Sequence, residues 1–259
     1  MKYKVCWVTL CKNEIDIIPF CADYWKRIAD KVIVYDNGSI DGSIEELEKY
    51  PFVEVRHFDS NGQNEFIQKA VKEQAYLELK DSYDIIIITD MDEIFYFDDF
   101  EALADEFIEG RYNVMSAPIY SLCEDYKPIY EEGKYLHQLC HKFYKQRMNH
   151  MKDFDDVAKL SIFNTRVTDK VEMSVGQHFV RTLPDMEILY EDNGFCLHID
   201  KGMGVDYKWK VRQRMYNNLS KENKMFNMCI EYSDSYEKLK NDYLNNQKKS
   251  LDINKIFTF

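Results

Sequence analysis

The feature that most constrains the fold is an alternation, over the first hundred residues, of short apolar runs with longer amphipathic stretches. Runs such as the four isoleucines at 85–88 are typical of strands buried on both faces, and the stretches between them repeat apolar residues at helical spacing. The pattern predicts an α/β fold with a mostly parallel, Rossmann-like central sheet and helices on both faces. The predicted strands cover residues 3–10, 31–39, 52–58 and 83–93, and the predicted helices cover residues 12–29, 43–50 and 62–80.

The pattern becomes less regular in the second part of the chain. A helix is predicted at 100–110, where Gly110 would end it, and strands are predicted at 112–122 and 159–167. Residues 123–158 are rich in aromatic and charged side chains, so we expect irregular structure there. No linker rich in proline, glycine or serine divides the chain, which favours one domain with a variable C-terminal half.

The charge and the cysteines limit the classes of function. The formal net charge of −12 argues against general nucleic-acid binding, which needs a basic face. Seven scattered cysteines without a Cys-x-x-Cys pair indicate reduced thiols rather than disulfides. The N-terminus does not resemble a signal peptide, and no apolar run reaches the roughly 18 residues of a membrane span. We therefore expect a cytoplasmic protein, with peripheral contact to the inner face of the membrane as an open alternative.

Polar residues follow each of the four predicted strands at the point where the strand ends. In sheets of this kind, ligands bind at the carboxyl ends of the strands, which lie along one edge. The sequence therefore predicts a polar cleft at this edge. The residues concerned are Asn13 and Glu14, Asp36 and Asn37, His57 and Asp59, and Asp90 and Asp92.

Asp90 and Asp92 are candidate metal ligands. Residues i and i+2 of a strand point the same way, so both carboxylates can address one point. Two such carboxylates repel each other unless a cation lies between them, and Mg²⁺ or Mn²⁺, which also bind substrate phosphates, are such cations. The alternative is a polar turn without a ligand, but the buried strand before it favours the metal. His178 and His198 are candidate further ligands for Mn²⁺, although a lone histidine in a strand is more often structural.

The segment DNGSIDG at 36–42 follows the second predicted strand. Either it is an ordinary strand-to-helix turn, or Asp36 accepts hydrogen bonds from the base or ribose of a nucleotide. Neither the glycine-rich dinucleotide motif nor the phosphate-binding loop motif occurs, so a phosphate would need a metal and basic side chains. Cations are concentrated at 201–224, where a solvated helix face and a contact with a diphosphate or an anionic surface are both open.

Taken together, these segments resemble a known group of enzymes. LCKNE at 10–14, DNGSIDGS at 36–43 and IIIITDMDEIF at 85–95 are similar to nucleotide-sugar glycosyltransferases of the GT-A fold. The similar group is family 2-like, with the pattern Lys-Asn-Glu, Asp-Asn-Gly-Ser-x-Asp and Asp-x-Asp-Glu-Phe. KLSIFN, VGQHF and LHIDKG resemble its later elements more loosely, with Ile94 where Phe is common and Ile199 where Tyr is common.

The resemblance implies a single GT-A domain with two halves. Residues 1–100 would bind the nucleotide sugar, residues 101–230 would form the acceptor side, and residues 231–259 would be a helical or loose tail. Asp36 would contact the base, most often uracil, and Asp90 and Asp92 would hold the ribose and the metal. The implied donor-binding residues are Leu10, Cys11, Asn13, Glu14, Asp36, Ser39, Asp90 and Lys159, and the implied metal ligands are Asp90, Asp92 and His198 or His178.

The implied reaction moves a hexosyl group from a nucleoside-diphosphate sugar, most often UDP-linked, to a hydroxyl of a glycan or lipid-linked acceptor, with inversion. Mn²⁺ or Mg²⁺ would neutralise the leaving diphosphate, and a carboxylate would act as general base. Asp156 is the preferred base, with Asp155, Glu124 and Asp125 as alternatives, and Glu93 would support the motif or face the sugar. Two rival interpretations stay open: another metal-dependent phosphate enzyme, either a nucleotidyltransferase or a phosphatase, and an inactive sugar-binding protein.

Overall fold

The computed structural model describes residues 2–146, 158–177 and 179–257. The strands are β1 (Val5–Cys11), β2 (Lys31–Asp36), β3 (Val53–His57), β4 (Ile85–Asp90), β5 (Glu93–Tyr96), β6 (Val114–Leu122), β7 (Phe143–Lys145), β8 (Ala158–Asn164), β9 (Lys170–Met173), β10 (Val180–Leu183), β11 (Ile188–Tyr190) and β12 (Phe195–His198). The helices are α1 (Ile18–Ile28), α2 (Ser43–Leu47), α3 (Glu65–Leu79), α4 (Phe100–Glu109), α5 (Leu136–Leu139), α6 (Val205–Asn217), α7 (Lys221–Met225) and α8 (Tyr236–Lys248), with short 3-10 helices at Val175–Gln177, Ile230–Ser233 and Ile253–Lys255.

The central sheet has the order β3-β2-β1-β4-β8-β6-β12-β5, with β7 and β11 paired to β6. The first four strands run parallel, as the alternation of strands and helices predicted. β8 is antiparallel to both β4 and β6, and β5 is antiparallel to β12. The mostly parallel α/β sheet flanked by helices is confirmed, and it is consistent with a single GT-A domain.

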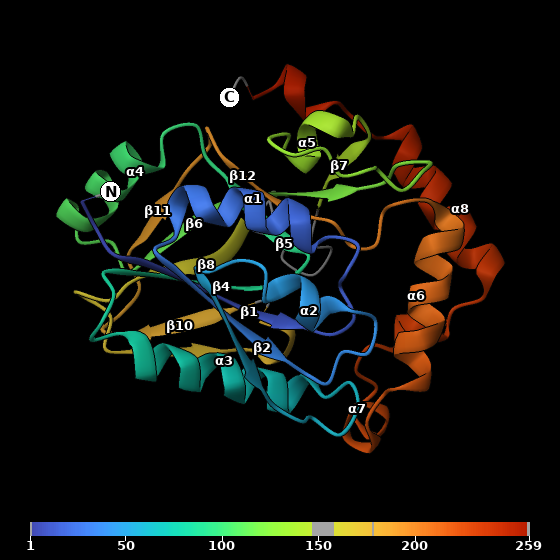
Figure 1. Ribbon diagram of the computed structural model, residues 1–259, viewed down its shortest axis with the longest axis horizontal. Helices are drawn as coiled ribbons and strands as arrows, with labels where there is room; N and C mark the ends of the chain where they lie inside the picture. Colours follow the sequence, from blue (N-terminus) through green and yellow to red (C-terminus); the bar gives the residue numbers. More distant parts are fainter. Residues whose placement is uncertain (1, 147–157, 178, 258–259) are drawn as a thin grey trace.

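Helices cover both faces of the parallel half (Figure 1). Val5 and Trp7 of β1 point to the face with α1, whereas Cys6 and Val8 point to the face with α3. The isoleucines of β4 alternate in the same way between the two faces. A strand covered on both faces needs apolar side chains that point both ways, and this is the physical reason for the apolar runs of β1 and β4.

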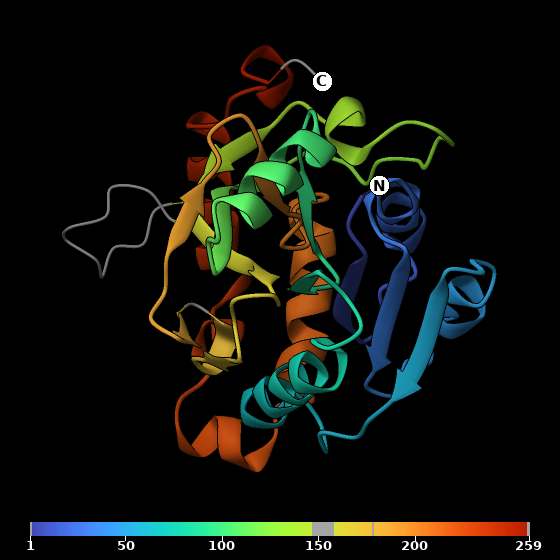
Figure 2. The ribbon, with the colours of Figure 1, turned by 90° about the vertical axis from the view of Figure 1, so that its left-hand side faces the viewer.

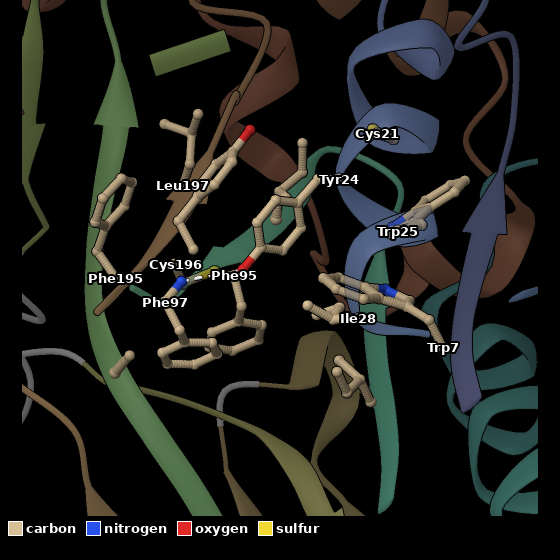
Figure 3. Close-up of a cluster of buried hydrophobic side chains, with 14 of the residues drawn as sticks. Trp7, Cys21, Tyr24, Trp25, Ile28, Phe95, Phe97, Phe195, Cys196 and Leu197 are labelled. Carbon is tan, nitrogen blue, oxygen red and sulfur yellow. Dashed lines mark hydrogen bonds between the residues drawn. The ribbon is translucent and has the colours of Figure 1, made fainter. Parts of the chain in front are cut away.

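The larger core lies on the α1 side and is rich in aromatic residues (Figure 3). Trp7 packs edge-on against Tyr24, with 6.4 Å between the ring centroids. The polar atoms of these two rings have partners: the Trp7 indole donates to Thr89 Oγ1 at 2.8 Å, and Tyr24 Oη accepts the Phe97 N–H at 3.0 Å. This packing fixes α1 and β5 against the central strands.

The second half departs further from a simple alternation. The predicted strands at 112–122 and 159–167 are confirmed as β6 and β8. Apart from Ala158, where β8 begins, the described part of 123–158 contains only the short α5 and β7. The β9–β10 hairpin lies beside α3 in both views (Figures 1 and 2). α6 lies across the edge where the parallel strands end (Figure 1). None of the helices in the described part of the chain combines the length and apolar character that a bilayer crossing needs.

Candidate functional site

The carboxyl ends of the parallel strands form one edge, as the polar strand ends predicted. The register pairs Leu10 with Asp90 across β1 and β4, and His198 at the end of β12 pairs with Glu93 of β5. A cleft of about 450 Å³ opens at this edge. Its lining includes Leu10, Cys11, Asn13, Glu14, Asp90, Asp92, Glu93, Lys159 and His198 from the predicted set, together with Glu65, Gln146, Gln177, Asp200, Lys201, Lys208, Arg212 and Arg214.

Glu93 holds the turn between β4 and β5. Its Oε2 accepts the backbone N–H of Asp90 at 3.2 Å, and its Oε1 lies 2.7 Å from Nζ of Lys159 on β8. Both side chains of this ion pair are less than a tenth exposed. Burial acts to lower the pKa of Lys159, but the carboxylates of Glu93 and Asp90 outweigh it and raise the pKa above its usual value. The Glu93 carboxylate therefore stabilises the turn between β4 and β5, and the Lys159 ammonium is held in a buried ion pair with it.

Asp90 is held by a buried lysine from α3. Lys72 Nζ lies 2.8 Å from Asp90 Oδ1 and donates to Gln177 Oε1, also at 2.8 Å. Gln177 in turn donates to the carbonyl of Ile88 and to Ser161 Oγ. Burial acts to raise the pKa of Asp90, but Lys72 and Lys159 outweigh it and hold the pKa below its usual value. Asp90 is therefore an ionised carboxylate that lines the cleft and is oriented by Lys72.

Lys201 joins the ends of β1 and β4. Its Nζ lies 2.5 Å from Glu14 Oε1 and 3.3 Å from Asp92 Oδ2. Burial raises the pKa of Glu14 to about 7, although Lys201 opposes the shift. At Asp92 burial is outweighed by Lys201 and His198, so the pKa is lowered. Asp92 is therefore ionised at neutral pH, whereas the pKa of Glu14 lies close to neutrality.

Asp36 and Ser39 shape the loop beside the cleft. The buried Asp36 carboxylate accepts the backbone N–H groups of Gly38 at 2.9 Å and of Ser39 at 3.1 Å. Ser39 Oγ accepts the backbone N–H of Asn13 at 2.8 Å. Gly38 has φ +73°, a conformation that glycine adopts without strain. Asp36 is not among the residues that line the cleft in the described structure, so its contact with a base stays a prediction.

α6 supplies cations to the opposite wall of the cleft. Lys208, Arg212 and Arg214 line it, and Arg214 Nη2 donates to the carbonyl of Asn13 at 3.4 Å. Lys208 Nζ lies 2.5 Å from Asp200 Oδ2. Part of the basic stretch at 201–224 therefore faces the predicted diphosphate region rather than solvent alone.

A comparison with protein-family models matches residues 6–171 to the family described as "Glycosyl transferase family 2". The match covers well over half of the chain, from β1 into β9. The chain belongs to glycosyl transferase family 2. The family description is that of glycosyl transferases, enzymes whose general partners are a nucleotide-sugar donor and an acceptor.

The search of curated proteins found no match. Among solved structures, two of S. aureus TarS are similar to this family 2 chain, each at 12% identity. One has a TM-score of 0.45 and covers 94% of this chain and 43% of that one; the other, of residues 1–349, has a TM-score of 0.41 and covers 88% and 70%. The chain thus spans less than half the length of the longer TarS structure.

The residues of this family 2 cleft are compatible with a partly hydrated divalent cation. Among the described residues, no group of three or more His, Cys, Asp or Glu side chains is placed to hold an ion by itself. Asp92 Oδ2 and His198 Nε2 lie 3.9 Å apart and face each other, which suits two ligands of one Mn²⁺. Mg²⁺ and Mn²⁺ commonly take one or two protein ligands and complete their shell with water and substrate phosphates. Each aspartate is paired with a lysine, Asp90 with Lys72 and Asp92 with Lys201, but Asp92 also faces His198 and is therefore the better placed of the two.

Several predicted residues cannot be placed or have other roles. Asp156, its alternative Asp155 and His178 lie outside the described residues. Glu124 is buried and accepts the backbone N–H of Lys142 at 2.8 Å, and the exposed Asp125 is paired with the Lys142 side chain. Glu124 therefore has a structural role in the fold.

Sequence reasoning missed Lys72, Gln177 and Asp200. The signal for Lys72 was present, because it shares the buried face of α3 with Ala75, Tyr76 and Leu79 at positions i, i+3, i+4 and i+7. A lysine on such a face needs a buried partner, which here is Asp90. Gln177 and Asp200 gave no comparable signal.

Proposed function

We propose that this protein is a metal-dependent hexosyltransferase that moves a sugar from a UDP-sugar to a hydroxyl of a glycan or lipid-linked acceptor, with inversion. One observation carries the proposal: an ionised Asp92, facing His198 across 3.9 Å, shares a cleft with Lys201 and Arg214 at the carboxyl ends of the parallel strands. Such a site combines anionic ligands for a cation with cations for phosphates.

The side chains of the cleft would divide the work as follows. Mn²⁺ or Mg²⁺, held by Asp92 and His198, would supply Lewis-acid neutralisation of the departing diphosphate. Lys201 and Arg214 would add positive charge beside the same phosphates, a contribution that is large in a cleft with little water. Asp90, fixed by Lys72, would accept hydrogen bonds from the ribose. Leu10, Cys11 and Asn13 would line the nucleotide pocket.

The identity of the general base is proposed from the resemblance to family 2-like enzymes. A carboxylate has to accept the proton of the acceptor hydroxyl as that oxygen attacks the anomeric carbon from the side opposite the diphosphate. Asp156 is the residue we propose for this role. A lipid-linked acceptor would bring the protein to a membrane surface, which is why we also propose peripheral contact with the membrane.

A thermal-shift panel of nucleoside diphosphates and nucleotide sugars, with and without Mn²⁺ or Mg²⁺, tests this function. A ligand that binds the folded state raises Tm by mass action. We expect a metal-dependent rise with UDP or a UDP-sugar that is lost in Asp92→Asn and retained in Asp81→Asn, a change at an exposed residue. A shift with another nucleotide would change the donor, and no shift with any would favour a phosphatase or an inactive sugar-binding protein.

A further inference from the structure

A second cavity, of about 430 Å³, lies between α6, α8 and β7. α6 and α8 run beside each other at one end of the molecule (Figure 1). Asp200, Lys208 and Arg212 line both this cavity and the main cleft. The two cavities are therefore neighbours that share one wall.

α8 presents a row of polar side chains to this second cavity. Asp242, Asn245, Asn246 and Lys249 follow one another at positions i, i+3, i+4 and i+7, so they lie on one side of the helix. Within the described part of the chain, no hydrogen bond or ion pair engages any of these four side chains. Two amides, a carboxylate and an ammonium group together offer donors and acceptors to a ligand.

The remaining lining indicates which kind of ligand fits. Tyr144 of β7, which is half-buried, adds an aromatic ring to the lining. The cations Lys208, Arg212 and Lys249 are nearly balanced by Asp200 and Asp242, and Lys208 is already paired with Asp200 at 2.5 Å. A phosphate would need a clear excess of free cations, whereas a neutral ligand with many hydroxyl groups matches this set.

The wall that the two cavities share includes a turn whose backbone is strained. Asp200 and Lys201 have φ +45° and +54°, and the Gly202 N–H donates to the Ile199 carbonyl at 2.7 Å. Two successive non-glycine residues in this conformation cost free energy and mark positions that the surrounding structure fixes. The turn directs Lys201 to Asp92 and Glu14 in the main cleft, while Asp200 reaches Lys208.

We infer that the second cavity binds a sugar residue of the acceptor, with Asp200 orienting it toward the main cleft. This inference rests on the proposed function, because an acceptor sugar is expected in the second cavity only if the main cleft holds a sugar donor. The amides of Asn245 and Asn246 and the carboxylate of Asp242 bind the sugar hydroxyls, and Tyr144 packs against the ring.

The test is a titration of the protein with the methyl glycosides of glucose, galactose, mannose and N-acetylglucosamine, followed by ¹H–¹⁵N NMR. We expect at least one glycoside to shift the side-chain amide signals of Asn245 and Asn246. Asn246→Ala should weaken this binding about fivefold, the effect of one neutral hydrogen bond. Asp242→Ala should weaken it more, by about tenfold or above, because a hydrogen bond to a charged carboxylate is stronger. Asn241→Ala, a change on the same helix outside the cavity, should leave the affinity unchanged.

UDP binding in the presence of Mn²⁺, measured on the same variants, separates this inference from the proposed function. Glycoside binding at Asn245 and Asn246 without any nucleotide binding would support the sugar site in the second cavity but contradict the proposed nucleotide-sugar donor. Nucleotide binding with no shift of these amides by any glycoside, or with shifts confined to the main cleft, would overturn the inference. Inorganic phosphate that shifts the amides in place of the glycosides would overturn it as well.

Discussion

Lys72 Nζ lies 2.8 Å from Asp90 Oδ1, although the two residues belong to different elements and Lys72 is almost completely buried. The lysine reaches through the core-facing side of α3 to the end of β4. Its charge lowers the pKa of Asp90, whose side chain is 40% exposed. This relationship makes Lys72 a positioning residue for the cleft.

Lys72→Met should weaken nucleotide binding in the presence of Mn²⁺. Removal of one charge-assisted hydrogen bond predicts a loss of roughly 10- to 100-fold in affinity. Because Lys72 lowers the pKa of Asp90, its loss should also move the acidic limb of binding to higher pH. Calorimetric titration with UDP between pH 5 and 8 measures both effects. Lys69→Met, which breaks a surface pair with Glu73 on the same helix, serves as control, and equal losses in both variants would contradict the role of Lys72.

Glu93→Ala should destabilise the fold by about 3–5 kcal/mol, because it leaves the buried Lys159 ammonium without its partner. Urea unfolding measures the change. The double variant Glu93→Leu, Lys159→Met should recover much of the loss, since it removes both buried charges. Asp234→Ala breaks the exposed pair with Lys238 and should cost less than about 1 kcal/mol. A free energy of unfolding that is unchanged in Glu93→Ala would show that Glu93 does not stabilise the turn.

Glu14 should make stability fall as pH rises toward neutrality. Its folded-state pKa, raised by burial from 4.5 to about 7, lies above the unfolded-state value, so ionisation opposes folding. The stabilising contribution of the protonated carboxyl is complete below about pH 4.5 and is lost by about pH 7. Glu14→Gln should therefore gain up to about 3 kcal/mol relative to the natural protein between pH 5 and 8. Urea unfolding of both proteins at these pH values measures the difference. If the free energies of unfolding of the two proteins changed in parallel with pH, the prediction would be contradicted.

Gly202→Ala should be strongly destabilising. A Cβ atom at Gly202 would lie 1.8 Å from the Leu122 carbonyl oxygen, a backbone atom that cannot move aside easily. We expect a loss of more than about 3 kcal/mol in the free energy of unfolding. Gly133→Ala is the matched control: its φ is +78° but no atom lies within 4 Å, so the cost should be about 1 kcal/mol. Equal losses of stability in the two variants would show that the turn at Asp200 and Lys201 moves to make room for the added Cβ atom.

The sequence by itself determined the parallel half of the fold and the edge that carries the cleft. The isoleucines of β4 predicted a strand buried on both faces, and the carboxylates after them predicted polar strand ends at one edge. These features depend on local periodicity, which a single sequence displays directly. The same reasoning left the choice between a turn-forming and a base-binding Asp36 open, and the structure shows the turn contacts of its carboxylate.

Only the tertiary structure decided which charges neutralise one another. Lys201 meets Glu14 and Asp92 across a sequence separation of more than a hundred residues, and Lys159 meets Glu93 across β8 and the β4–β5 turn. Tertiary packing also joined α6 and α8 into the wall of a second cavity. Such pairs form between residues that are far apart in the sequence, and the local periodicity of a sequence does not show which distant segments come together. The local pattern therefore predicted the strands and their polar ends, while long-range packing set the partners of the carboxylates in the cleft and the direction in which the pKa values of Glu14, Asp90 and Asp92 shift.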